Sequence, residues 1–127
     1  MSSWTIAAYA AGGAGAVARY VFDAQFKAWV TTRLPVATIL INIVGSALLG
    51  LVTGFVVFAG APSTLSLVAG TGFCGGFTTF STASFETVAL ARRDDNTLAL
   101  VNAVGTWVLT VLACAAGMWV AWAIHRI

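Results

Sequence analysis

The sequence predicts an all-α integral membrane protein with four transmembrane helices, the third of them broken at mid-membrane. Of its 127 residues, 60% are hydrophobic and only 8% are charged. A water-soluble domain of this size keeps too much surface in water to hide that much apolar area. Four apolar stretches are long enough to enter a membrane, and glycines interrupt the third. We therefore expect one domain, 1–127, embedded in a lipid bilayer.

The first two spans are separated by a polar segment. The first apolar stretch covers about 5–22, and its only charge is Arg19. Residues 23–35 alternate aromatic with charged side chains, a pattern typical of a short amphipathic helix at the membrane interface. Pro35 ends that helix, and the second span, 36–58, contains no charged residue.

The third and fourth spans cover about 65–91 and 97–124. At about 1.5 Å per helical residue, each predicted span can cross a hydrocarbon layer of about 30 Å, the first only barely. Small residues four positions apart let helix backbones approach closely in lipid. Such pairs occur in the first three spans: Gly12 and Ala16, Gly50 and Gly54, Gly72 and Gly76. They predict a tightly packed bundle.

The segment 72–87 has the composition expected of a binding site. Adjacent glycines, Gly75 and Gly76, are followed closely by Thr78 and Thr79, and this combination weakens a helix. Lipid cannot satisfy unwound backbone, so such a break is tolerated where it is buried in protein or binds an ion or water. We interpret this segment as a functional helix break rather than a simple kink.

Polar side chains extend this segment into a track. Hydroxyl residues fill six of the ten positions 78–87, and Glu86 is the only acidic residue inside a predicted span. Ionisable groups in lipid usually mark a pathway, although a protonated structural glutamate is the alternative. Asn42 stands alone in an apolar run, where its amide serves either as helix glue or as a ligand. The fourth span carries three polar residues on one face: Asn102, Thr106 and Thr110. Together they predict a narrow, mostly neutral hydrogen-bonding track.

Several function classes are disfavoured. A net charge of +2 without a basic cluster gives no reason to expect a nucleic-acid partner. Cys74 and Cys114 have no metal-binding spacing, and His125 has no base–nucleophile set around it, so we do not expect an enzyme. A small proton-coupled multidrug exporter remains a less favoured alternative. It would need a carboxylate in the first helix, and only Glu86 could stand in for it.

Three sequence blocks carry a resemblance to a known family: Gly12–Tyr20, Thr38–Gly45, and Gly75–Thr82 with Glu86. In this order, on four spans, they resemble the signature blocks of the CrcB/Fluc fluoride channels over nearly the whole chain. The resemblance implies a fluoride-selective passive channel that lowers cytoplasmic fluoride. It also implies a bacterial-type inner (plasma) membrane and a dimer of antiparallel subunits with two pores.

The resemblance also implies roles for individual residues. Backbone carbonyls of Gly75 and Thr78 would hold a structural sodium ion at the dimer centre. Asn42 would donate to fluoride, and Arg19 would be structural or anion-attracting. The remaining pore positions would be Phe80, Ser81, Thr82, Ala83, Glu86, Thr106 and Thr110.

Two features depart from the expected pattern. Ala83 stands where the family has a second pore phenylalanine, and Phe85 lies about 200° around the helix from it. The basic residues are also uneven: one predicted side carries only Arg126, whereas the other carries Lys27, Arg33, Arg92 and Arg93, with Arg19 near the boundary. This bias predicts a single orientation with both termini outside. The alternative to a homodimer is thus one subunit of a heterodimer with a paralogous chain, inactive alone.

Overall fold

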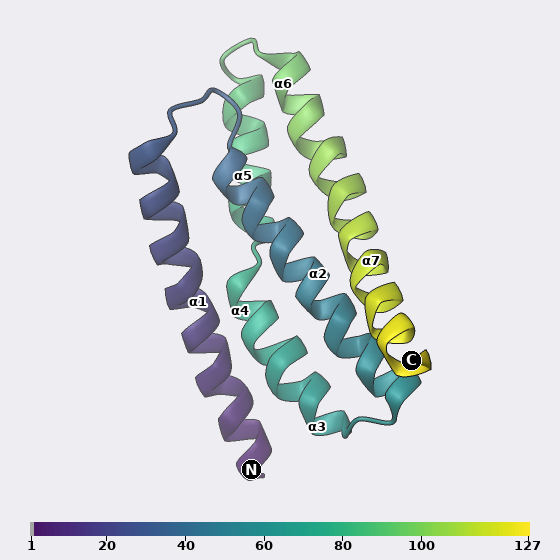
Figure 1. The fold of residues 1–127 in the computed structure, drawn as a ribbon. Helices are drawn as coiled ribbons and strands as arrows, with labels where there is room; N and C mark the ends of the chain where they lie inside the picture. Colours follow the sequence, from purple (N-terminus) through teal and green to yellow (C-terminus); the bar gives the residue numbers. More distant parts are fainter. Residues whose placement is uncertain (1) are drawn as a thin grey trace.

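The computed structural model describes residues 2–127, and this part of the chain is helical with no strand. Four rods run side by side (Figure 1). The first two rods are the single helices α1 (Ser3–Trp29) and α2 (Val36–Ala59). The third consists of α3 (Ser63–Leu65), the π-helix η1 (Ser66–Cys74), α4 (Gly75–Phe77) and α5 (Phe80–Ala91). The fourth is continuous through α6 (Asn96–Leu100), the π-helix η2 (Val101–Gly105) and α7 (Thr106–Arg126). The all-α prediction is confirmed.

Both termini lie at the same end of the bundle, together with the turn between α2 and α3 (Figure 1). The opposite end carries the connections that follow α1 and α5. Arg33 in one connection lies 3.6 Å from Asp95 in the other, so an ion pair joins them. The basic residues flanking these connections are therefore gathered at one end, as the sequence predicted.

The first helix is longer than expected. The separate interfacial helix predicted within 23–35 is wrong, because α1 continues without interruption to Trp29. A salt bridge of 2.8 Å between Lys27 and Asp23, one turn apart, and stacking of Phe22 on Phe26 support this last part of the helix. The chain leaves the helix at Val30, and α2 starts directly after Pro35.

Two helices in the described chain are long and apolar enough to cross a membrane, Val36–Ala59 and Asn96–Arg126. They correspond to the second and fourth predicted spans. The third rod is divided into shorter pieces, and α1 carries more polar residues, so the first and third spans stay predictions. Most large apolar side chains on the rods are exposed, as a lipid-facing surface requires.

Glycines set the spacing between the rods. A Cβ at Gly50 of α2 would overlap the carbonyl of Cys114, and one at Gly117 of α7 would overlap the carbonyl of Ala47. The same kind of contact joins α1 to the third rod, where a Cβ at Gly76 would overlap the carbonyl of Gly12. The backbones therefore touch directly, as small residues at helix interfaces in lipid permit.

The interior of a single chain is thin and partly polar. The largest side chains with almost no exposure are Ile41, Asn102 and Thr38, two of which are polar. Asn42 is also buried, with 7% of its surface exposed. Since buried polar groups are costly unless they are hydrogen-bonded, these residues must tie helices together or serve a binding site.

Replacing Gly50 by Ala should lower the free energy of unfolding in detergent by about 1–3 kcal/mol, because a new methyl group must push α2 and α7 apart. Gly13→Ala is the matched control, since a Cβ at Gly13 meets no atom within 4 Å and any gain in helix propensity applies to both variants. Equal stability of the two variants in denaturant titrations would contradict the proposed glycine contact.

Candidate functional site

Helical hydrogen bonding stops within the third rod at two threonines. Thr78 (φ −76°, ψ 160°) and Thr79 (φ −149°, ψ 118°) have extended backbone between α4 and α5. The sequence indicated unwinding from the glycines onward, but Gly75 and Gly76 remain helical and only the threonines are extended. That this break in the third rod lies at mid-membrane stays a prediction.

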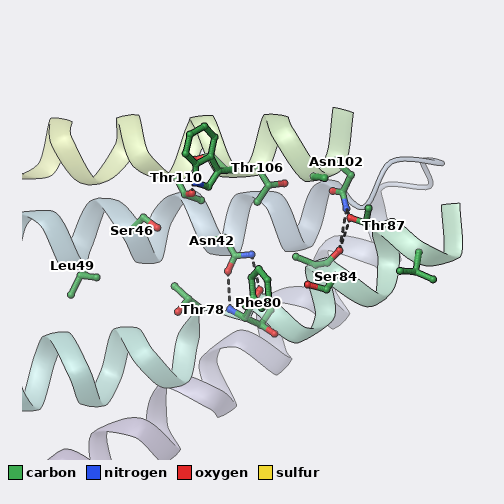
Figure 2. A pocket seen from close by; sticks show the side chains of 15 residues that line it. Asn42, Ser46, Leu49, Thr78, Phe80, Ser84, Thr87, Asn102, Thr106 and Thr110 are labelled. Atoms are coloured by element: carbon green, nitrogen blue, oxygen red, sulfur yellow. Dashed lines mark hydrogen bonds between the residues drawn. The ribbon is translucent and has the colours of Figure 1, made fainter. Parts of the chain in front are cut away.

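Asn42 of α2 replaces the missing helical partners of Thr79. Its Oδ1 accepts from the Thr79 backbone N–H at 2.7 Å, and its Nδ2 donates to the Thr79 carbonyl at 2.9 Å (Figure 2). The side-chain amide of Asn42 thus bonds both the N–H and the carbonyl of Thr79, as the backbone of a neighbouring β-strand would. Because an amide nitrogen carries two hydrogens, one donor of Asn42 is left for another partner.

The start of α5 is capped by Thr79. Its Oγ1 accepts from the backbone N–H of Thr82 at 3.2 Å and donates to the Thr82 hydroxyl at 3.0 Å. The hydroxyl of Ser81 lies 3.3 Å from the same oxygen and is exposed. The contacts that Thr82 and Ser81 make within one chain are therefore those of the helix cap.

A second amide fastens α5 to the fourth rod. Asn102 of η2 donates from Nδ2 to the Thr87 hydroxyl at 2.8 Å and to the Ala83 carbonyl at 3.3 Å (Figure 2). Thr87 in turn donates to the same carbonyl at 2.8 Å. Asn102 Oδ1 and the nearby Thr106 Oγ1 are buried and have no hydrogen-bond partner among residues 2–127.

A groove of about 520 Å³ lies between α2, α5 and the fourth rod, next to the extended threonines. Figure 2 shows Asn42, Phe80, Thr106 and Thr110 arranged around it. Among the described residues, no acidic or basic side chain lines it. Its lining comes from four segments: Asn42, Ser46 and Leu49; Thr78 and Thr79; Phe80, Ala83, Ser84, Thr87 and Val88; Asn102, Ala103, Thr106, Trp107 and Thr110.

The structure brings together part of the predicted site. The groove contains these predicted residues: Asn42, Phe80, Ala83, Thr106, Thr110 and Thr78. Ser81, Thr82 and Glu86 do not line it. One carboxylate oxygen of Glu86 lies 3.9 Å from Lys27 Nζ, and the other is buried without a partner among the described residues. Glu86 therefore faces α1 rather than the groove.

Sequence reasoning missed five lining residues, three of them small or aliphatic (Leu49, Val88 and Ala103) and the other two Ser46 and Trp107. Ser46 lies four residues after Asn42, which places it on the same face of α2, and this spacing was available as a signal. Trp107 follows Thr106 directly and has no such signal, because an isolated tryptophan in an apolar helix usually contacts lipid.

The two carbonyls expected to hold sodium are free of backbone partners. The helical donor for Gly75 would be the N–H of Thr79, which Asn42 takes. The helical donor for Thr78 would be the N–H of Thr82, which the Thr79 hydroxyl takes. Oxygen atoms left free in this way suit a small hard cation. Arg19 binds the neighbouring carbonyl of Gly76 through Nε at 3.4 Å and so joins α1 to the end of α4.

Known proteins share this sequence over most of its length. The fluoride-specific ion channel FluC 1 of Leifsonia xyli is 44% identical over 109 residues, which cover 86% of this chain and 80% of that protein. The fluoride-specific ion channel FluC of Nitrobacter winogradskyi is 42% identical over 118 residues, or 91% and 94% of the two chains. FluC 2 of Cutibacterium acnes is 41% identical over 109 residues, or 85% and 89%. Residues 6–118 match the family model described as CrcB-like protein, Camphor Resistance (CrcB), so the chain belongs to the CrcB family, as its sequence blocks indicated.

Proposed function

We propose that this protein forms a fluoride-selective channel that lets fluoride leave the cytoplasm passively across the inner (plasma) membrane. The observation that carries the proposal is the uncharged groove at the extended threonines, in a chain whose relatives are named fluoride-specific channels. Phe80, with 88% of its surface exposed, stands beside this groove. A channel of this kind performs no covalent chemistry.

Fluoride is small and strongly hydrated, so a pathway must offer donors that replace its water. The groove offers the unused amide hydrogen of Asn42 and the unpartnered hydroxyl of Thr106. The Thr110 hydroxyl donates to the Trp107 carbonyl at 3.0 Å and would have to turn away from it to donate to fluoride. The edge of the Phe80 ring carries partial positive charge and suits an anion. Ser81 and Thr82 would join the track at its start, and Glu86 would lie at its margin near Lys27. The neutral lining supports anion passage without a fixed-charge ring.

The pathway would be completed by a second subunit. The groove of a single chain is open to its surroundings, and Phe80 and Phe85 are largely exposed. We propose an antiparallel dimer with two pores, as the resemblance to the CrcB/Fluc fluoride channels implies. A sodium ion at its centre would be held by the carbonyl oxygens of Gly75 and Thr78 from each subunit, which accept from no backbone donor among residues 2–127. The ion would join the subunits and contribute positive charge close to the anion path.

A heterodimer is the second candidate, and two observations favour it. Ala83 lines the groove where a second aromatic ring is expected, so two equal pores in a homodimer would both lack that ring. Lys27, Arg33, Arg92 and Arg93 lie at or next to the connections that follow α1 and α5, and this bias toward one end of the bundle favours one orientation in the membrane. A partner of opposite orientation would then be a paralogous chain.

Liposomes that contain this protein alone and are loaded with fluoride should release it passively, whereas chloride should be retained. The reason is that the uncharged hydrogen-bond donors of the groove can replace the water around fluoride, whereas chloride is larger and does not fit the same narrow path. Efflux recorded with a fluoride-selective electrode, against protein-free liposomes, tests this expectation. Absence of fluoride efflux would exclude a self-sufficient channel and leave the heterodimer.

Replacing Asn42 by Asp should slow fluoride efflux about tenfold or more, since a lost hydrogen bond to a buried or charged group has an effect of this order. Aspartate keeps the acceptor for the Thr79 N–H but loses both amide hydrogens. Thr53→Val on the same helix, outside the groove, is the control. Efflux equal to that of the unmodified protein would show that Asn42 neither contacts fluoride nor holds the break.

A reporter fused after Ile127 should appear on the outer side of the membrane only, because the basic end of the bundle favours the cytoplasm. Accessibility of the reporter in intact cells measures this. Equal amounts on both sides would indicate dual topology and would support the homodimer instead.

A further inference from the structure

Trp107 lies in the groove, although nothing in the sequence marked it as functional. It is the second residue of α7 and lines the groove together with Phe80 and Ala83. Its own chain leaves 69% of its surface exposed. On the proposed function as a fluoride channel, we infer that the indole N–H of Trp107 is a further fluoride contact, and that Trp107 supplies the aromatic wall beside Ala83.

Its depth separates Trp107 from the other tryptophans. Trp4, Trp29, Trp119 and Trp122 all lie within seven residues of an end of their rod, as the interfacial belt of a membrane protein requires. Trp107 is 11 residues from Asn96 and 19 from Arg126 in the continuous helix Asn96–Arg126. At about 1.5 Å per residue, these separations are about 16 Å and about 28 Å. A hydrocarbon layer of about 30 Å centred on this helix would therefore include Trp107.

An indole at this depth needs an acceptor that lipid tails cannot provide. The Nε1–H of Trp107 makes no hydrogen bond with any described residue, whereas Trp122, near the helix end, has Arg126 stacked at 4.4 Å from its ring. The carbonyl of Trp107 is already bound by the Thr110 hydroxyl at 3.0 Å. Since indole nitrogen is a donor only, the side chain suits an anion and cannot bind a cation through nitrogen.

The surroundings favour an anion as that acceptor. Thr106, directly before Trp107, carries a buried hydroxyl without a partner among residues 2–127. Asn42 reaches the groove from α2 with one unused amide hydrogen. No carboxylate of the described chain lines the groove, so none of these competes for the donors. Ala83 has only a methyl side chain, and a flat indole can occupy the space that a larger residue would fill.

The experiment compares W107F with W119F in liposomes. W107F keeps an aromatic ring and removes the N–H, whereas Trp119 lies on the same helix with 64% of its surface exposed and outside the groove. Fluoride efflux should fall about tenfold in W107F, the effect of one lost hydrogen bond to a charged group, and stay within about twofold of the unmodified protein in W119F. Elution in size-exclusion chromatography verifies that each variant is folded.

Tryptophan emission gives a second readout that does not depend on flux. Addition of fluoride, but not chloride, should change the emission of the unmodified protein and of W119F, and this change should be absent in W107F. A chain in which Trp107 is the only tryptophan should still respond, which tests the contact without altering it. Normal efflux in W107F, or a fluoride response that persists there, would overturn the inference.

The two proposals fail in different ways. If the unmodified protein alone carries no fluoride, the self-sufficient channel fails, and the emission change alone decides whether Trp107 contacts fluoride. If the unmodified protein carries fluoride and W107F carries it equally well, the channel stands and the role of Trp107 is refuted.

Discussion

The pair of hydrogen bonds between Asn42 and Thr79 is the interaction on which the rest of the structure depends. An interrupted helix in an apolar environment exposes N–H and carbonyl groups that lipid cannot satisfy. Asn42 satisfies both backbone groups of Thr79 from a neighbouring helix, at 2.7 Å and 2.9 Å. By taking the N–H of Thr79, it also leaves the carbonyl of Gly75 without its helical donor. One side chain thus stabilises the interruption and creates the free oxygen beside it.

A second amide acts on the other side of α5. Asn102 fixes the Ala83 carbonyl and the Thr87 hydroxyl to the fourth rod, so α5 is held between two amides from different helices. Such interactions determine position more than stability, because buried hydrogen bonds replace similar bonds to water in the unfolded chain. Since the apolar interior of one chain is thin, these polar contacts determine where α5 and its side chains lie.

Much of the fold could be predicted from composition and small-residue spacing, because these reflect the solvent around the helices. Gly50 and Gly76 do pack backbone against backbone, and Asn42, Thr106 and Thr110 do meet in one groove. The extended segment begins at Thr78 rather than at the glycines, since glycine weakens a helix but only the competing bonds from Asn42 interrupt it. That competition is between distant parts of the chain and is not visible in local sequence.

The glycine contacts between α2 and α7 have a consequence for discrimination among anions. Gly50 and Gly117 do not line the groove, yet they fix how closely its two walls approach. In the proposed channel, the cross-section available to an ion would therefore be set by residues that never touch it. Size selection in such a channel would depend on helix spacing as much as on the groove's own side chains, and a single added methyl group at a remote contact would act on it.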